Sequence, residues 1–100
     1  MPVESLLNTF SGLRTQYKKL QKNPKANKQA SSTIKKLANG SLKIGDKNVK
    51  KIQGLKNVYE AKSKDVRVYF QMDGNTVQII APCLKVDQRK SIELLKKYFT

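Results

Sequence analysis

The chain has 100 residues, a formal net charge of +14, a single cysteine and no histidine. This length suits one domain with one modest core, so we expect a single domain spanning residues 1–100, and the composition excludes an intrachain disulfide, a Cys/His zinc site and a catalytic group built on histidine. The positive charge indicates an acidic partner: RNA, DNA, an anionic membrane or an acidic protein.

Apolar residues at helical spacing predict two helices in the first forty residues. The first is expected over residues 5–22, with a stripe made of Leu6, Phe10, Leu13, Tyr17 and Leu20. Asn23 is expected to cap a second helix, with Pro24 at its first position and the Asn39-Gly40 pair at its end. The two helices then form an antiparallel hairpin.

Lysines lie largely off these apolar stripes and continue into a basic loop, predicted over residues 41–56 with short extended pieces. They form either an ordinary solvated face or a phosphate-binding surface, which attracts nucleic acid at long range and in a salt-sensitive way. On the second interpretation, RNA contacts come from Lys18, Lys19, Lys22, Lys51 and Lys56.

Period-two alternation predicts an antiparallel meander of strands over residues 57–81. One face is apolar and holds Tyr59, Ala61, Val66, Val68, Phe70 and Met72. The other face is expected to be open and holds Glu60, Lys62, Arg67, Tyr69 and Gln71. A three-residue turn at 63–65 and a tight turn at Asp73-Gly74 connect the strands, and Pro82 is expected to end regular pairing.

A short C-terminal helix follows, capped by Asp87 and buried through Ile92, Leu95 and Phe99. The order of elements predicts an α+β fold in which a helical hairpin packs on one face of a small antiparallel sheet. Cys83 lies in an apolar run and is expected in the core, with a redox or nucleophilic role as the alternative. The chain has no apolar run as long as a membrane span, so we expect a cytoplasmic protein without a membrane partner.

Four segments carry a resemblance to a known family: GLKNVYEAK (54–62), VRVYF (66–70), DGNTVQII (73–80) and LKVDQRKSI (84–92). This pattern resembles the RelE/ParE superfamily of type II toxin–antitoxin toxins, over roughly residues 5–100. The resemblance implies that the protein cleaves messenger RNA, mostly at the ribosome, as the RelE-like branch does, or poisons DNA gyrase, as the ParE-like branch does. It also implies an acidic antitoxin as partner and no cofactor. The family usually begins with a strand, whereas residues 3–10 here favour a helix.

The resemblance places five candidate catalytic residues at Glu60, Lys62, Arg67, Lys85 and Tyr98. Cleavage of RNA by its 2′-hydroxyl needs a base, a cation at the phosphate and an acid, and without histidine Glu60 is the best base. Arg67 suits the phosphate, because its planar fork matches two oxygens. Tyr69 is expected either to stack on a base or to donate a proton, and further RNA contacts are expected from Gln71, Gln88 and Arg89.

A plainer interpretation stays open. Glu60, Lys62 and Arg67 also fit a cross-strand charge cluster on a solvated sheet face, and Lys85, Gln88 and Arg89 fit exposed first-turn residues of a helix. The sequence therefore allows two classes of function. One is a metal-independent endoribonuclease toxin that arrests translation. The other is a gyrase poison or a basic nucleic-acid-binding protein without enzymatic activity.

Overall fold

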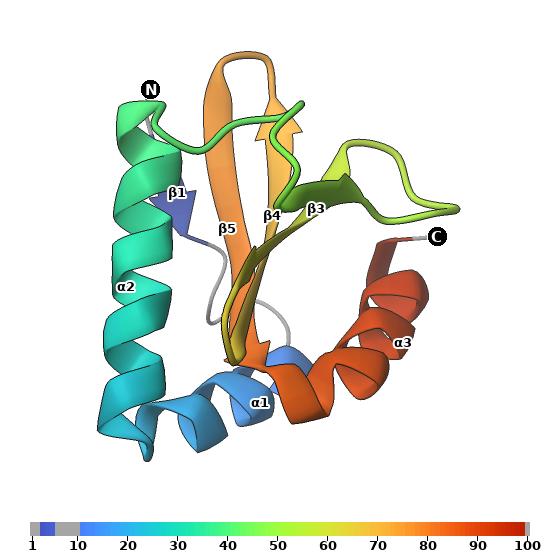
Figure 1. The fold of residues 1–100 in the computed structure, drawn as a ribbon. Helices are drawn as coiled ribbons and strands as arrows, with labels where there is room; N and C mark the ends of the chain where they lie inside the picture. The colour runs from blue at the N-terminus through green and yellow to red at the C-terminus, as the bar shows by residue number, and fades with distance from the viewer. Residues whose placement is uncertain (1–2, 6–10, 100) are drawn as a thin grey trace.

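The computed structural model describes residues 3–5 and 11–99 and has an α+β fold (Figure 1). Its elements in chain order are β1 (Val3–Ser5), α1 (Ser11–Gln21), α2 (Pro24–Asn39), β2 (Val49–Lys51), β3 (Val58–Ser63), β4 (Val66–Asp73), β5 (Thr76–Leu84), a 3-10 turn (Lys85–Asp87) and α3 (Gln88–Phe99). The strands form one sheet in the order β1-β5-β4-β3-β2. Strands β2 to β5 are antiparallel, and β1 joins the edge parallel to β5.

The second helix begins and ends where its sequence predicts. The side chain of Asn23 accepts a hydrogen bond from the backbone N–H of Ala26 at 3.1 Å, and Pro24 opens the helix. Gly40 follows the last turn with φ of 82°, a left-handed conformation that glycine adopts at low cost. These local signals predict α2 correctly because each acts through its own backbone neighbours.

The prediction of a helix from residue 5 is wrong, because Val3–Ser5 is a strand and α1 begins at Ser11. The local apolar spacing carries no information about β5, which provides the pairing for this strand at Val77 to Ile79. The predicted stripe members Leu6 and Phe10 lie outside the described residues.

The first hairpin loop is shorter than predicted, and the second is a tight turn as predicted. The pairs Ser63↔Val66 and Asp73↔Thr76 leave two residues in each loop, so the predicted three-residue turn is too long by one. Lys64 closes the first loop with φ of 50°, a conformation uncommon for a residue with a side chain.

The first sheet face packs against α2, as predicted, and against the end of α1 at Leu20. Val66, Val68 and Phe70 of β4 are buried with apolar residues of α1 and α2. Tyr59 and Ala61 of β3 join the same cluster, and the Tyr59 ring stacks on Phe70 with centroids 5.6 Å apart. The period-two pattern therefore identifies the face that the helices cover.

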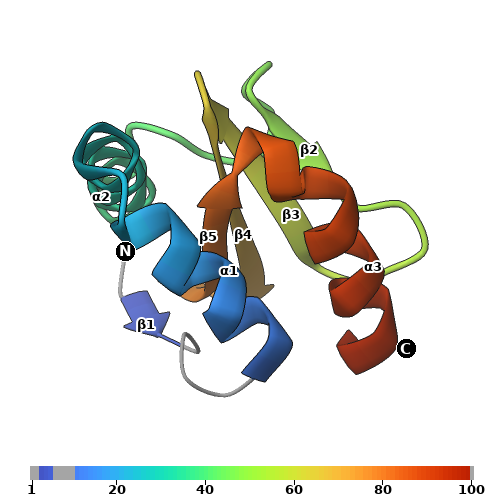
Figure 2. The same ribbon diagram turned by 90° about the horizontal axis from the view of Figure 1, so that it is seen from below.

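The two helices do not form the predicted antiparallel hairpin, because α1 runs across the end of α2 and not alongside it (Figures 1 and 2), and Leu13 of α1 is buried with Tyr69 and Leu95.

The second sheet face is not open, which corrects the prediction. Helix α3 covers it from the side opposite α2 (Figures 1 and 2), and Leu95 is buried there in a second apolar cluster with Tyr69 and Ile80. A bulge helps to build this cluster: Tyr69 pairs with Ala81 and Phe70 with Ile79, so Ile80 is an extra residue that turns to the same face as Ala81. The sheet is therefore a middle layer between helices.

Pro82 does not end the sheet, because β5 continues to Leu84 and Pro82 pairs with Val68. In the described part of the chain β1 pairs only with residues 77–79, so at Pro82 the strand has a neighbour on one side. A proline is tolerated at such an edge position, because no second strand requires its missing N–H. None of the helices in the described residues is long and apolar enough to cross a membrane.

Candidate functional site

A pocket of about 340 Å³ lies between α3 and the β2–β3 side of the sheet. It is lined by Lys50, Lys51, Ile52, Gln53, Glu60, Lys62, Arg67, Gln88, Ile92 and Lys96. The pocket exists because α3 packs through Leu95 against Tyr69 at one end and leaves the polar side chains of β3 partly uncovered at the other. It thus brings together three of the predicted catalytic residues, Glu60, Lys62 and Arg67.

Glu60 supplies the carboxylate of this pocket and is only 4% exposed. Its Oε2 accepts a hydrogen bond from the Tyr69 hydroxyl at 2.9 Å and another from Gln88 Nε2 at 2.8 Å. Tyr69 reaches it because the two residues are directly opposed in the β3–β4 ladder. These bonds offset the cost of burying the carboxylate, and among the described residues none is made to Oε1. Oε1 is therefore the oxygen left for a bound molecule.

Tyr69 holds this carboxylate and does not bind a base. The side chain is fully buried, so the prediction that it stacks on RNA is wrong. Burial raises the pKa of its hydroxyl well above the ordinary 10.0, and Cys83 and Glu60 nearby raise it further. The phenol consequently stays protonated and acts as a fixed hydrogen-bond donor to Glu60.

Arg67 lies beside the pocket and is 7% exposed. Its Nη1 donates to the carbonyl oxygens of Lys64 and Val66, both at 2.9 Å, which fixes the plane of the guanidinium. Its Nε is buried without a partner, whereas Nη2 is neither bonded nor buried among the described residues. No ion pair joins Arg67 to Glu60 there, although both residues line the pocket, so the guanidinium charge is not neutralised by this carboxylate.

Lysines surround this pair. Lys50 lies opposite Glu60 in the β2–β3 ladder, and Lys62 lies opposite Arg67 in the β3–β4 ladder. Lys51 and Lys96 complete the lining, with Glu60 as its only acidic member. A pocket with this excess of ammonium and guanidinium groups attracts phosphate and other anions.

Five lining residues are not among the predicted site residues: the apolar Ile52 and Ile92 and the polar Lys50, Gln53 and Lys96. For Lys96 a signal was present, because Gln88, Ile92 and Lys96 are spaced by four residues and so share one face of α3. For Lys50 and Gln53 the signal is missing, since their segment shows no clear alternation. The register of β2 places Lys50 opposite Glu60, and Gln53 follows this strand.

Two predicted catalytic residues lie away from the pocket lining. Tyr98 is near the start of α1, where its hydroxyl accepts a hydrogen bond from the Gly12 N–H at 3.4 Å. Lys85 has an exposed side chain, and its backbone N–H donates to the Asp65 carbonyl at 2.7 Å. The structure therefore does not bring Lys85 and Tyr98 together with Glu60 and Arg67 in the lining of this pocket.

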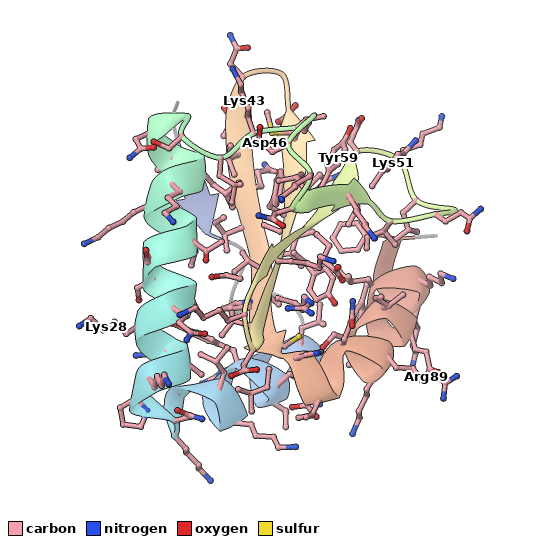
Figure 3. The ribbon with its side chains drawn as sticks, viewed as in Figure 1. Lys28, Lys43, Asp46, Lys51, Tyr59 and Arg89 are labelled. Atoms are coloured by element: carbon pink, nitrogen blue, oxygen red, sulfur yellow. The ribbon has the colours of Figure 1, made fainter. Side chains whose placement is uncertain are left out.

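The predicted RNA contacts divide in the same way. Gln88 and Lys51 line the pocket, whereas Lys56 and Gln71 do not. Arg89 is exposed, and Figure 3 shows it extending outward from α3. Lys18 and Lys19 on α1 and Lys22 just after it are exposed and do not line the pocket.

Asp87 was predicted to cap α3 but instead binds α1. Its Oδ1 lies 3.1 Å from Lys19 Nζ, while its buried Oδ2 has no hydrogen-bond partner. Asp87 directly precedes Gln88, the first residue of α3, but among the described residues its carboxylate bonds to Lys19 and to none of the first helical N–H groups.

Cys83 is buried and free, as predicted for a core residue. Burial raises the pKa of its thiol from the ordinary 9.0 to about 11, so the thiol is protonated at neutral pH and is a poor nucleophile. Among the described residues no group of His, Cys, Asp or Glu side chains is arranged to hold a metal ion. No protein-family model, curated protein or solved structure matches the chain.

Proposed function

We propose that the protein is an endoribonuclease toxin of the RelE-like kind, which cleaves messenger RNA in the pocket between β3 and α3. The observation that carries the proposal is the pairing of a buried, oriented carboxylate, Glu60, with an oriented guanidinium, Arg67, inside a lysine-lined pocket. An ordinary solvated charge cluster does not account for these two residues, because both are more than nine-tenths buried.

The proposed reaction is an internal transfer at one phosphodiester of the RNA. Glu60 Oε1 takes the proton of a ribose 2′-hydroxyl, and the 2′-oxygen attacks the adjacent phosphorus. The bond from phosphorus to the 5′-oxygen breaks, which leaves a 2′,3′-cyclic phosphate on one fragment and a 5′-hydroxyl on the other. Arg67 Nη2 stabilises the charge on the phosphate, and the Lys62 ammonium protonates the leaving oxygen.

Tyr69 and Gln88 act as positioning residues in this scheme. They bind Oε2 of Glu60 and leave Oε1 directed at the substrate. The pocket lining has no aromatic side chain, so the base beside the scissile bond packs against Ile52 and Ile92 rather than stacking on a ring.

The proposal includes the partners that the resemblance implies. A net charge of +14 favours binding to RNA or to the ribosome, and it also favours binding to an acidic antitoxin. Such complexes weaken as the salt concentration rises. On this proposal the protein works in the cytoplasm, where messenger RNA is translated.

Expression in growing cells tests the proposal. The wild-type protein is expected to stop translation and to leave messenger RNA fragments that end in 2′,3′-cyclic phosphate, and Arg67→Ala is expected to prevent both. Lys35→Ala serves as control, because Lys35 is an exposed lysine on α2 that lines none of the described pockets. Intact messenger RNA together with a DNA-damage response would support a gyrase poison instead, and harmless expression would support a plain binding protein.

A further inference from the structure

A second basic pocket lies on the other side of β3. It has a volume of about 440 Å³ and is lined by Thr33, Lys36, Leu42, Asn48, Lys62, Ser63, Lys64 and Arg67. No acidic residue contributes to it. The pocket forms because β2 is short. Its pairing with β3 ends near Asn48, whose carbonyl oxygen accepts a hydrogen bond of 2.8 Å from the Lys62 N–H. Beyond this point the edge of β3 at Ser63 faces α2 across the pocket.

The two pockets share two cations. Lys62 and Arg67 line both, and they are directly opposed in the β3–β4 ladder. Since α2 and α3 lie on opposite sides of the sheet (Figures 1 and 2), a molecule that occupies both pockets must cross the end of β3 at these two residues. The fixed guanidinium of Arg67, with its buried and unpartnered Nε, therefore carries charge that serves both sides.

The chemistry of the second pocket suits a phosphate and not a base. Lys36, Lys64 and the two shared cations offer charge, and Asn48 and Ser63 offer hydrogen bonds, but the lining has no aromatic ring for stacking. Contacts of this kind position a nucleic-acid backbone without reading its sequence.

We infer that the second pocket is a phosphate subsite that holds the phosphate next to the scissile one along a single RNA strand. This inference rests on the proposed function, since it places the scissile phosphate in the first pocket. It defines the substrate class as a single strand with at least two consecutive phosphates. A duplex is excluded from this path, because successive phosphates must bend around the end of β3 from one face of the sheet to the other, and only a flexible strand makes that bend.

Binding of short 2′-O-methyl oligonucleotides to the full chain tests the subsite without any cleavage, because these probes lack the reactive hydroxyl. A trinucleotide without terminal phosphates carries two phosphates and a dinucleotide carries one. The ratio of their affinities therefore reports the added nucleotide, and the change of this ratio in a variant that lacks the charges of the second pocket reports the phosphate contact. The test variant Lys36→Ala/Lys64→Ala removes charge only from the second pocket. The control variant Lys35→Ala/Lys47→Ala removes the same charge from exposed positions that line neither pocket.

The test variant is expected to bind the trinucleotide about tenfold more weakly than the control variant does, because one charge-assisted contact is lost. The two variants are expected to bind the dinucleotide with the same affinity. The slope of log K against log salt for the trinucleotide should also fall by about 0.7, the value for one phosphate of a single strand. Equal losses for the two probes, or losses no larger than in the control, would overturn the subsite. If the wild-type protein cuts no RNA, the proposed function fails, and the affinity ratio still decides the subsite.

Discussion

The hydrogen bond from Tyr69 to Glu60 is the part of the site whose energy follows most directly from the structure. Tyr69→Phe removes only the hydroxyl and keeps the fully buried ring. The lost bond is 2.9 Å long and ends on a buried carboxylate, so its removal should lower the free energy of unfolding by about 1.5–3 kcal/mol. The Gln88 bond to the same oxygen remains and keeps the loss from growing larger.

Urea unfolding followed by circular dichroism measures this loss, since the chain has no tryptophan to report it by fluorescence. Tyr59→Phe is a matched control on β3, because the Tyr59 hydroxyl makes no hydrogen bond within the described residues, and it should change the free energy by less than about 0.5 kcal/mol. In a Glu60→Gln background the cost of Tyr69→Phe should fall to about 0.5–1.5 kcal/mol, because the acceptor is then neutral. A Tyr69→Phe cost equal to that of Tyr59→Phe would refute the account of how Glu60 is held.

Three further outcomes are expected. Gly12→Val should lower the free energy of unfolding by about 1–3 kcal/mol, because a Cβ at Gly12 already lies 3.1 Å from Leu94 Cδ2; Gly12→Ala, measured alongside by urea unfolding, should cost less. The free energy of unfolding should decline as pH rises from 9.0 to about 11, because the raised pKa of the Cys83 thiol favours the folded state only while this thiol is protonated. An equal decline in the stability of a Cys83→Ala variant would contradict this explanation. Lys19→Ala should change stability by less than about 1 kcal/mol, since Lys19 is 58% exposed and its pair with Asp87 is screened by water.

The local parts of the fold were predictable from the sequence. Asn23, Pro24 and Gly40 specify the ends of α2 through hydrogen bonds and backbone angles close along the chain. The alternation of β4 correctly assigns Val68 and Phe70 to the face that α2 covers, because side-chain direction in a strand depends only on position.

The parts that depend on distant neighbours were not predictable in this way. Alternation places Glu60, Arg67 and Tyr69 on one face but does not say that α3 covers it, and Tyr69, with an apolar ring and a polar end, suits either environment. Strand β1 depends on β5, which lies more than seventy residues further along the chain. The sequence therefore predicted Glu60, Lys62, Arg67, Lys51 and Gln88 as site residues, while Lys50 and Lys96, and the hydrogen bonds by which Tyr69 and Gln88 hold Glu60, required the fold.

The central claim is that Glu60 takes part in chemistry and not only in binding. Wild-type protein and Glu60→Gln should be compared for both the affinity of an uncleavable 2′-O-methyl RNA and the single-turnover rate on the matching ribose RNA. Glutamine keeps an acceptor for Tyr69 and Gln88, so the affinity should change less than about threefold, while the rate should fall by about 10²–10⁴, the contribution of a general base. An undiminished rate, or a rate that falls only as far as the affinity does, would contradict the account.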